Sequence, residues 1–275
     1  MALRRSRISA ISQKRGRLAR ELICLDLPRE NFQADTVNCA AVIPCFNESA
    51  SITALTRALR QRLPSVVVVD DGSTDGTAHL AQNAGALVIR HDRNRGKGAA
   101  LQTGLAWALK KNFAWVVTLD GDGQHAPDDL PALWRCAEST GARLVVGNRM
   151  NDACAMPWLR RRVNRWMSRQ LSRRAGKILP DTQSGFRLIH LPTWAALPIN
   201  AERFEIESEM LLAFLAAGER VEFVPVSVIA SARRSHIRPV TDSVRWLKWW
   251  SAVRISKREE AGRDRHSVRA VVANQ

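Results

Sequence analysis

The chain has 275 residues and a formal net charge of +16. This length suits one large domain with a sizeable core, and this charge favours an anionic partner. Five scattered cysteines show no metal-ligand spacing, which argues against a disulfide framework and suits a reducing compartment. No apolar run approaches the length of a membrane span, and the basic N-terminus lacks the continuous apolar core of a signal peptide.

Apolar runs alternate with amphipathic stretches along the first half of the chain. The runs predict strands at 38–43, 65–70, 86–90, 115–120 and 143–147. The stretches between them predict helices near 49–62, 76–84, 97–111 and 127–140. This alternation is typical of an α/β fold with a mostly parallel sheet flanked by helices. In the less regular second half we expect a basic helix at 160–174, a strand at 186–189, an amphipathic helix at 205–217 and a strand at 221–228.

Three of the expected strands end in polar and acidic residues. The first leads into Pro-Cys-Phe-Asn-Glu at 44–48, and the second into Asp-Asp-Gly-Ser at 70–73. Strand 115–120 leads into Asp-Gly-Asp-Gly-Gln-His at 120–125. In an open parallel sheet, ligands bind at the carboxyl ends of the strands. The sequence therefore predicts one binding site at this edge.

The third strand end predicts a metal site. Asp120 and Asp122 lie one residue apart, and residues i and i+2 of an extended strand point to the same side. Gly121 lets the backbone come close to a ligand, and Gln124 adds an amide oxygen. Such oxygen ligands suit Mg²⁺ or Mn²⁺, which keep open positions for substrate phosphates. His125 is either a further ligand or a turn histidine satisfied by the backbone.

Six motifs occur together in one order. The chain reads Pro-x-Phe-Asn-Glu at 44–48, Val-Asp-Asp-Gly-Ser-Thr-Asp-Gly-Thr at 69–77, Asn-Arg-Gly-Lys-Gly-Ala-Ala-Leu-Gln-Thr-Gly at 94–104 and Leu-Asp-Gly-Asp-Gly-Gln-His at 119–125. Gly-Asn-Arg follows at 147–149, and Asp-Thr-Gln-Ser-Gly-Phe at 181–186. Over roughly residues 38–230, this set resembles the family-2 glycosyltransferases with the GT-A fold. The spacing is similar to that of the branch with dolichyl-phosphate mannose synthase and bacterial polyprenyl-phosphate sugar transferases.

The resemblance implies a site for a nucleotide-diphosphate sugar. The implied donor-binding residues are Pro44, Phe46, Glu48, Val69, Asp71, Lys97, Asp120, Gly121 and Arg234. Among them, Asp71 would read the base or ribose, and Phe46 stands where a tyrosine is usual. Asp70 either contacts the donor or only caps its turn. Lys97 lies on a glycine-containing turn that enters a helix, an arrangement that favours phosphate, and the alternative in the resembled family is a turn that mainly packs against the donor.

The resemblance also implies roles at the metal. Asp122 would bind the divalent ion that bridges the diphosphate, Asp120 would contact ribose or metal, and Gln124 would complete the metal shell. Mg²⁺ or Mn²⁺ held there would act as a Lewis acid and neutralise the departing nucleoside diphosphate.

Basic residues further along the chain are candidates for an acceptor phosphate. Arg149 follows strand 143–147, and its guanidinium can clamp a phosphate with paired hydrogen bonds. Arg161, Arg165 and Ser168 are spaced to share one face of the basic helix and to address one anion. In the dolichyl-phosphate enzymes a comparable region holds the acceptor phosphate, and the alternative is a solvated helix face. We expect Asp122, Arg149 and Arg165 to carry catalysis.

One segment departs from the resembled branch. That branch often carries an Arg-x-Gly-x-Ser-Lys-like loop, whereas residues 233–239 read Arg-Arg-Ser-His-Ile-Arg-Pro. Arg234 and Arg238 can serve the diphosphate instead, but at a different spacing. The departure bears on the acceptor rather than on the donor chemistry.

These observations lead to three functional hypotheses. The first is an inverting glycosyltransferase that moves a sugar from a nucleotide-diphosphate donor to a polyprenyl phosphate, whose anionic oxygen needs no strong base. The second is transfer to a hydroxyl of a lipid or glycan, which needs a base such as Asp181, Glu205 or Glu207, unless these residues are caps or salt-bridge partners. The third is an inactive nucleotide-sugar or membrane-binding module, and the intact acidic motifs argue against it.

The ends of the chain predict contact with a membrane surface. We expect a basic tail at 1–35, the GT-A glycosyltransferase domain at 36–235, and a basic, tryptophan-rich segment at 236–275. In the last segment, the apolar residues of one helix face are Trp246, Trp249, Trp250 and Val253. Tryptophan beside basic residues is typical of a helix in a membrane interface, although the stripe can also pack on the catalytic domain.

The excess of positive charge also raises nucleic acid as a partner. The chain contains no recognisable nucleic-acid-binding module or stacking platform, and it has no tyrosine. We therefore expect an anionic membrane surface and no nucleic acid as partner. The expected location is cytoplasmic, peripheral on the inner face of the membrane.

Overall fold

A seven-stranded sheet forms the centre of the computed structural model, which describes residues 38–150, 158–229, 246, 247 and 249–251. The strands are β1 (Cys39–Cys45), β2 (Ser65–Asp70), β3 (Leu87–Arg90), β4 (Trp115–Thr118), β5 (Leu144–Asn148), β6 (Arg187–His190) and β7 (Val221–Pro225). Their order is β3-β2-β1-β4-β6-β5-β7. Only β6 is antiparallel to its neighbours, β4 and β5, among these described strands. The predicted α/β fold with a mostly parallel sheet is confirmed.

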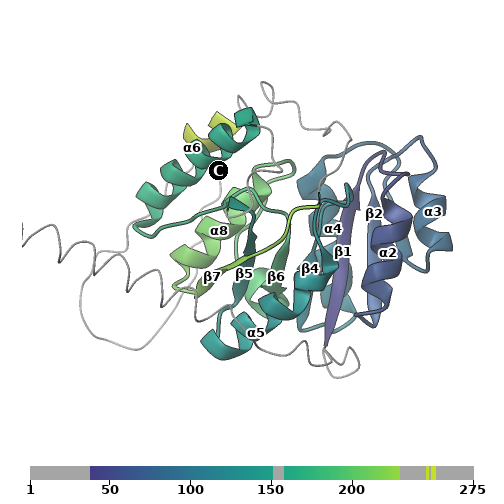
Figure 1. Cartoon of the computed structure of the whole chain (residues 1–275), viewed down its shortest axis with the longest axis horizontal. Coiled ribbons are helices and arrows are strands. Elements are labelled where there is room, and N and C mark those ends of the chain that lie inside the picture. Colours follow the sequence, from purple (N-terminus) through teal and green to yellow (C-terminus); the bar gives the residue numbers. More distant parts are fainter. Residues whose placement is uncertain (1–37, 151–157, 230–245, 248, 252–275) are drawn as a thin grey trace, which may run out of the picture. The chain divides into compact units, whose positions relative to one another are not determined.

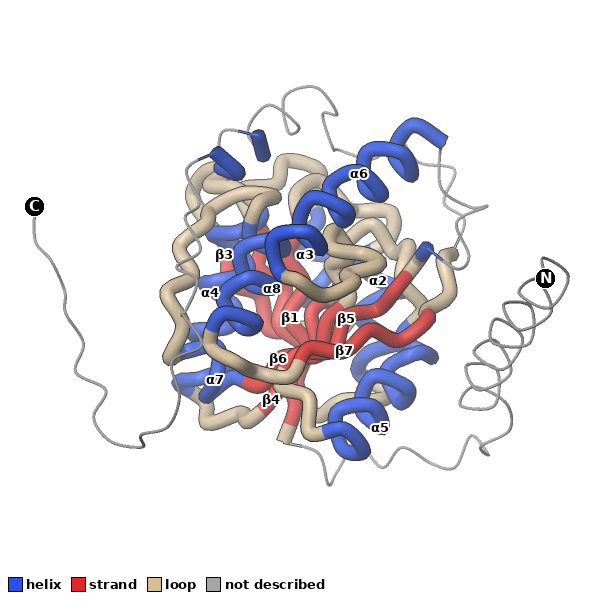
Figure 2. Tube along the Cα trace, turned by 90° about the vertical axis from the view of Figure 1, so that its left-hand side faces the viewer, coloured by secondary structure: helices blue, strands red, loops and turns tan. Residues whose placement is uncertain are grey.

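Helices cover both faces of this sheet (Figure 1). One face packs against α2 (Ile52–Arg60), α3 (Thr77–Asn83) and α5 (Leu130–Thr140). The other packs against α4 (Lys97–Lys110), α7 (Leu191–Ala195) and α8 (Ile206–Ala216). Figure 2 shows α4, α7 and α8 on one side of the strands, with α2 and α5 on the other. Helix α6 (Trp158–Ala175) contacts α8.

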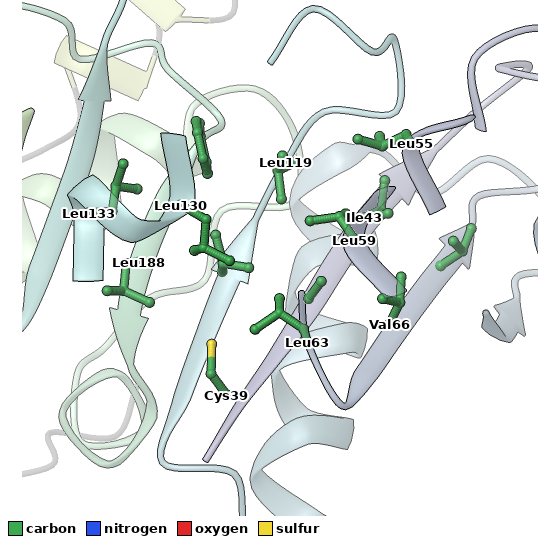
Figure 3. Packing of buried hydrophobic residues seen from close by; sticks show 14 of the residues in the cluster. Cys39, Ile43, Leu55, Leu59, Leu63, Val66, Leu119, Leu130, Leu133 and Leu188 are labelled. Carbon is green, nitrogen blue, oxygen red and sulfur yellow. The ribbon is translucent and has the colours of Figure 1, made fainter. Parts of the chain in front are cut away.

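The central strands are buried on both faces, which explains their continuous apolar runs. All residues of β1 are buried. On the side of α2, Ile43 of β1 packs with Leu55 and Leu59 (Figure 3). On the other side, Gly104 lets α4 lie close to the sheet, because an added Cβ would collide with side chains of β1 and β2. The N-terminus of α4 lies at the carboxyl ends of the strands, because α4 follows the end of the parallel strand β3.

The observed elements differ from the expected ones mainly at their ends. The helix expected at 127–140 begins as a 3₁₀ turn, η2 (Pro127–Asp129), before α5. The last strand ends at Pro225, three residues early, because proline cannot donate to a strand ladder. The five-residue helix α7 was not expected, since it is too short to show a hydrophobic period. Cys39, Cys45 and Cys136, within the described residues, are free thiols.

The chain divides into two compact units, residues 1–235 and 236–275, and the tryptophan-rich segment lies in the second. Its described residues are helical, and three indole rings lie against one another there. Trp246 stacks on Trp250 with ring centroids 5.2 Å apart and planes at 9°, and the Trp246–Trp249 centroids are 6.0 Å apart. The three tryptophans therefore share one side of the helix. Val253 and the basic tail at 1–35 lie outside the described residues.

Candidate active site

The three polar strand ends meet at one edge of the sheet. Strands β2, β1 and β4 are neighbours and run in the same direction, so their carboxyl ends lie side by side. The loops after them are joined by hydrogen bonds. Ser51 Oγ donates to the carbonyl oxygen of Gly121 at 2.6 Å, and the Asp71 backbone N–H donates to the carbonyl oxygen of Cys45 at 2.8 Å. The sequence motifs therefore form one local site.

Glycines let the backbone crowd the predicted metal ligands. A Cβ added at Gly121 would come within 2.6 Å of the Cys45 sulfur. One added at Gly185, in the segment before β6, would overlap the carboxylate of Asp120. Asp122 remains half-buried, and its Oδ1 accepts the backbone N–H of Gln124 at 3.1 Å in a tight turn. Both aspartates and Gln124 therefore lie in one compact loop, whose shape depends on glycine.

Asp120 has basic partners at both of its oxygens. Lys97 Nζ lies 2.6 Å from Oδ1, and His125 Nε2 lies 3.5 Å from Oδ2. Burial alone would raise the pKa of the Asp120 carboxyl, but Lys97 and His125 outweigh burial and hold this pKa well below its usual range. The His125 ring is buried against Phe186, and its Nδ1 has no hydrogen-bond partner among the described residues. His125 thus faces Asp120 and is not satisfied by the backbone.

Lys97 also contacts a second carboxylate. Its Nζ lies 2.5 Å from Glu207 Oε1, on the first turn of α8. Burial alone would lower the pKa of the Lys97 ammonium, but Asp120 and Glu207 outweigh burial and raise this pKa above its ordinary value. Lys97 was expected to address a donor phosphate, and the structure instead places it between two carboxylates. Sequence reasoning missed this pairing, because nothing in the spacing of the chain links Lys97 to Glu207.

Asp71 is engaged by the loop that enters α4. Its Oδ1 contacts His91 Nδ1 at 2.7 Å and accepts the Arg95 backbone N–H at 2.9 Å. Its Oδ2 accepts the Gly96 backbone N–H at 2.8 Å, and the side chain is buried. Asp71 therefore orders this loop. Its expected contact with base or ribose stays a prediction, and so does any donor contact of Asp70, which accepts the Ser73 backbone N–H at 3.0 Å.

The other expected donor residues occupy different depths at the strand ends. Phe46 and Glu48 are half-buried just beyond β1, and Pro44 is buried at its end. The side chain of Val69 packs in the core with Val67 and Ala100, and its expected donor contact stays a prediction. Side chains alternate along a strand, and this alternation turns the Val69 side chain towards α4. Arg234 lies outside the described residues.

Arg149 is held by a buried carboxylate. Its Nε lies 2.8 Å from Asp181 Oδ2, and its Nη2 lies 3.0 Å from Oδ1. Asn164 Nδ2 also donates to Asp181 Oδ1 at 3.0 Å. Burial alone would raise the pKa of the Asp181 carboxyl, but Arg149 and Asn164 outweigh burial and lower this pKa to about 2. A general base needs a pKa near the working pH and access to substrate, so Asp181 does not suit that role.

The expected phosphate-binding face of α6 is divided between interior and surface. Ser168 is buried, and its hydroxyl contacts Asn164 Oδ1 at 3.2 Å and Thr182 Oγ1 at 3.1 Å. Arg165 is exposed and Arg161 is half-buried. The inner stripe of the helix consists of Asn164, Met167, Ser168 and Leu171. Ser168 belongs to that stripe, so Arg161, Arg165 and Ser168 do not form the common face that the spacing predicted.

Arg160 is a candidate that sequence reasoning missed. Its Nη1 lies 3.4 Å from Gln124 Oε1, so the first turn of α6 reaches the predicted metal loop. Burial, followed by repulsion from Arg149, lowers the pKa of Arg160, while Asp120 and Asp122 oppose this shift. The sequence offers three consecutive arginines here, and only the helix orientation shows which one turns towards Gln124. Two guanidinium groups, those of Arg149 and Arg160, thus act on the carboxylate loop.

The donor atoms of this loop fit a hard divalent cation. Two carboxylates and one amide oxygen are ligands that Mg²⁺ and Mn²⁺ accept. Within the described residues, no group of three or more His, Cys, Asp or Glu side chains could hold a metal ion, and the expected set includes only two such residues. Gly185 carries no Cβ, which would overlap the Asp120 carboxylate, so that carboxylate is not covered by a side chain from the segment before β6. The residues present therefore fit the predicted ion.

Solved structures share this architecture. The chain is similar to glucosyl-3-phosphoglycerate synthase from Mycobacterium tuberculosis in complex with Mg²⁺ and uridine diphosphate, with a TM-score of 0.61 and 21% identity over 81% of this chain and 80% of the other. A complex of that synthase with Mn²⁺, uridine diphosphate and phosphoglyceric acid matches with a TM-score of 0.59 and 21% identity, over 81% and 80% of the two chains. At this identity the likeness shows the fold, which is GT-A.

Curated proteins match at higher identity. An uncharacterized protein of Methanocaldococcus jannaschii is 31% identical over 74% of this chain and 87% of its own length. Undecaprenyl-phosphate mannosyltransferase of Micrococcus luteus is 28% identical, over 68% of this chain and 82% of its own. UDP-N-acetylglucosamine–dolichyl-phosphate N-acetylglucosaminyltransferase of Methanococcus voltae is 28% identical, over 68% and 84%. Residues 40–191, which include all six motifs, match the family described as glycosyl transferase family 2, and the chain belongs to that family.

Proposed function

We propose that this protein is an inverting, metal-dependent glycosyltransferase that moves a sugar from a nucleotide-diphosphate donor to a polyprenyl phosphate. The observation that carries the proposal is the contact of Arg160 with Gln124 in the Asp120–Gln124 loop at the ligand edge of the sheet, where, against the effect of burial, the carboxylates also raise the pKa of the nearby Arg149. Carboxylates on one side and guanidinium groups on the other can accommodate a cation and phosphates together.

Asp120, Asp122 and Gln124 would hold Mg²⁺ or Mn²⁺, which when bound supplies Lewis-acid stabilisation to a departing nucleoside diphosphate. Phe46 and Glu48 lie at the adjacent end of β1, where a nucleotide base can pack. Arg160 and Arg149 would bind phosphate oxygens, and Arg161 and Arg165 on α6 would guide the acceptor phosphate. In this proposal the nucleotide lies at the ends of β1 and β2, and the acceptor phosphate lies beside α6.

A phosphate acceptor suits the charge state of the site better than a hydroxyl acceptor. A phosphate oxygen is already anionic, whereas a hydroxyl needs a base. Asp181 is paired with Arg149, and the 4%-exposed Glu207 is paired with Lys97, so of the three expected bases only the half-buried Glu205 is left to take a proton. Relatives named for undecaprenyl phosphate and dolichyl phosphate support the same choice.

We further propose that the enzyme works as a peripheral protein on the cytoplasmic face of a membrane. Within the described part of the chain, no helix is long and apolar enough to cross a bilayer. The stacked tryptophans at 246, 249 and 250 lie in a basic segment, and the half-buried Trp249 and Trp250, rather than the 2%-exposed Trp246, would enter the interface of an anionic leaflet.

The direct test is a donor screen with Mn²⁺ or Mg²⁺ present, which compares a polyprenyl phosphate with a polyprenyl alcohol as acceptor. Release of nucleoside diphosphate and formation of a lipid-linked sugar only with the phosphate would support the proposal. Product formed only with the alcohol would show that the acceptor is a hydroxyl and not a phosphate. Failure of every donor to react, by a protein that is folded, would favour an inactive binding module.

A further inference from the structure

Lys97 joins two parts of the site that lie far apart in the chain. Its ammonium contacts Asp120 at the end of β4 and Glu207 on the first turn of α8. It is the first residue of α4, and the backbone there is fixed against the segment before α8. The Ala99 N–H donates to the Glu202 carbonyl oxygen at 2.9 Å, and a Cβ at Gly98 would collide with residues 201–203.

The three side chains leave little room for independent movement. Glu207 is 4% exposed, and the Lys97 and Asp120 side chains are 16% and 19% exposed. Beneath Glu207, the buried Arg187 donates from Nη1 to the Glu207 carbonyl oxygen at 2.7 Å, which fixes the start of α8. The Lys97 Nζ also lies 5.8 Å from the centroid of the Phe204 ring. The ammonium is therefore shared between two largely buried carboxylates, and Oδ2 of Asp120 faces away from it towards His125.

This sharing has an electrostatic consequence for a cation at Asp120. An ammonium paired with Asp120 alone would cancel much of the negative charge that attracts a divalent ion. A second carboxylate takes part of that ammonium's charge and leaves Asp120 more negative. The Coulomb energy between charges a few ångströms apart is larger in a partly buried site than in water, because the effective dielectric constant is lower.

We propose that Lys97 is a positioning residue that divides its charge between Asp120 and Glu207, so that α8 sets how strongly the Asp120–Asp122 loop holds a divalent cation. The inference rests on the proposed function, because it assumes that this loop binds the ion. It adds Glu207, a residue distant in the chain from the proposed ligands, as a determinant of metal affinity that acts through Lys97.

The test is a double-mutant cycle on the full chain, with Mn²⁺ alone as the probe and the free Mn²⁺ signal in electron paramagnetic resonance as the readout. Glu207→Gln should weaken Mn²⁺ binding by about five- to tenfold, since Lys97 then acts on Asp120 alone. Lys97→Met should bind Mn²⁺ at least as tightly as the wild type, because a nearby positive charge is removed. In the Lys97→Met background, Glu207→Gln should have no further effect on affinity.

The controls are Lys110→Met, an exposed lysine at the other end of α4, and Glu202→Gln, an exposed glutamate near α8. Both should leave the Mn²⁺ affinity unchanged. An equal loss from Glu207→Gln in both backgrounds would show that Glu207 acts directly through space, and no loss in either would show that it does not act at all. Each of these results overturns the inference.

Lys97→Met leaves Glu207 buried without its partner, so that variant can fail to fold. The double variant Lys97→Met/Glu207→Gln removes both charges and should recover thermal stability relative to Lys97→Met. If only the double variant folds, it should still bind Mn²⁺ at least as tightly as the wild type, while Glu207→Gln binds more weakly. Weaker Mn²⁺ binding by the double variant than by Glu207→Gln overturns the inference. Wild-type protein whose Mn²⁺ binding is absent, or is unchanged by Asp122→Asn, overturns the proposed metal site itself.

Discussion

Asp181 and Arg149 form a buried, two-pronged ion pair, with Nε–Oδ2 at 2.8 Å and Nη2–Oδ1 at 3.0 Å. The backbone N–H of Arg149 donates to the same carboxylate at 3.1 Å. This pair sets the direction of a guanidinium at the ligand edge, and it ties the end of β5 to the segment before β6. The Asp181 carboxylate therefore contributes both to the stability of the fold and to the charge of the site.

Asp181→Asn should lower the free energy of unfolding by about 3–5 kcal/mol, because it leaves the Arg149 charge buried without a partner. Urea unfolding at neutral pH measures this loss. Asp128→Asn, at an exposed carboxylate that pairs with Arg62, is the matched control and should change stability little. A loss no larger than that of the control would contradict the structural role of the pair.

The same pair predicts a pH dependence. The pKa of Asp181 is lowered to about 2 in the folded state, whereas an unfolded aspartate titrates near about 3.9. A depressed folded pKa contributes stability that is present above the unfolded value and is lost as pH falls towards the folded value. Wild-type protein should therefore lose more stability between about pH 4 and pH 2 than Asp181→Asn does. An equal loss of stability in the wild type and in Asp181→Asn over this pH range would contradict the lowered pKa of Asp181.

Asp122→Asn should lower the rate of sugar transfer by orders of magnitude while the fold stays intact. The substitution keeps the shape of the side chain and removes the charge that would hold the divalent ion. Steady-state assays with saturating Mn²⁺, together with thermal unfolding, measure both effects. Near-normal turnover by a folded variant would show that Asp122 is not a metal ligand.

Arg165→Ala should raise the acceptor KM or lower kcat and leave donor binding nearly unchanged, since Arg165 lies on the exposed side of α6. Arg169→Ala, another exposed arginine on the same helix, is the control. Nucleotide affinity measured by calorimetry separates the two substrates. An equal loss of nucleotide affinity would place this side chain at the donor instead.

Replacement of Trp246, Trp249 and Trp250 with serine should abolish sedimentation with anionic liposomes and preserve nucleotide binding. Tryptophan side chains prefer the interface, where the ring is buried and the N–H stays hydrated. Trp134→Ser, at a partly buried tryptophan packed against Trp115, is a control for general loss of aromatic residues. Unchanged liposome binding by the triple variant, or its wholesale unfolding, would show that the three rings are not the anchor.

The sequence predicts the sheet and the carboxylate loop well, because both depend on local patterns. Asp120, Asp122 and Gln124 follow directly from the end of β4, and the strand direction brings them to the ligand edge. The partners of those residues could not be predicted in the same way. Lys97 meets Glu207, and Asp181 meets Arg149, only after helices and strands distant in the chain have packed.

Helix orientation is the second limit. The spacing of Arg161, Arg165 and Ser168 permits a common face, but spacing does not say which face of α6 is buried. The apolar positions Met167 and Leu171 mark the inner stripe in the structure, and Ser168 lies within it. A polar residue beside buried apolar ones can be an internal hydrogen-bonding group, and sequence alone does not separate that role from ligand binding.

The antiparallel direction of β6 decides which loops around it can change length. Since β6 lies between β4 and β5 and runs against both, its leading segment arrives at the ligand edge. That segment follows α6 and brings Asp181 and Gly185 to the site. An insertion there would shift Asp181 away from Arg149 and Gly185 away from Asp120. The turn at Asn112, which joins α4 to β4 at the opposite edge, is separated from the chemistry by the length of a strand. Variation in loop length, and the attachment of other modules, is therefore better tolerated at that far edge.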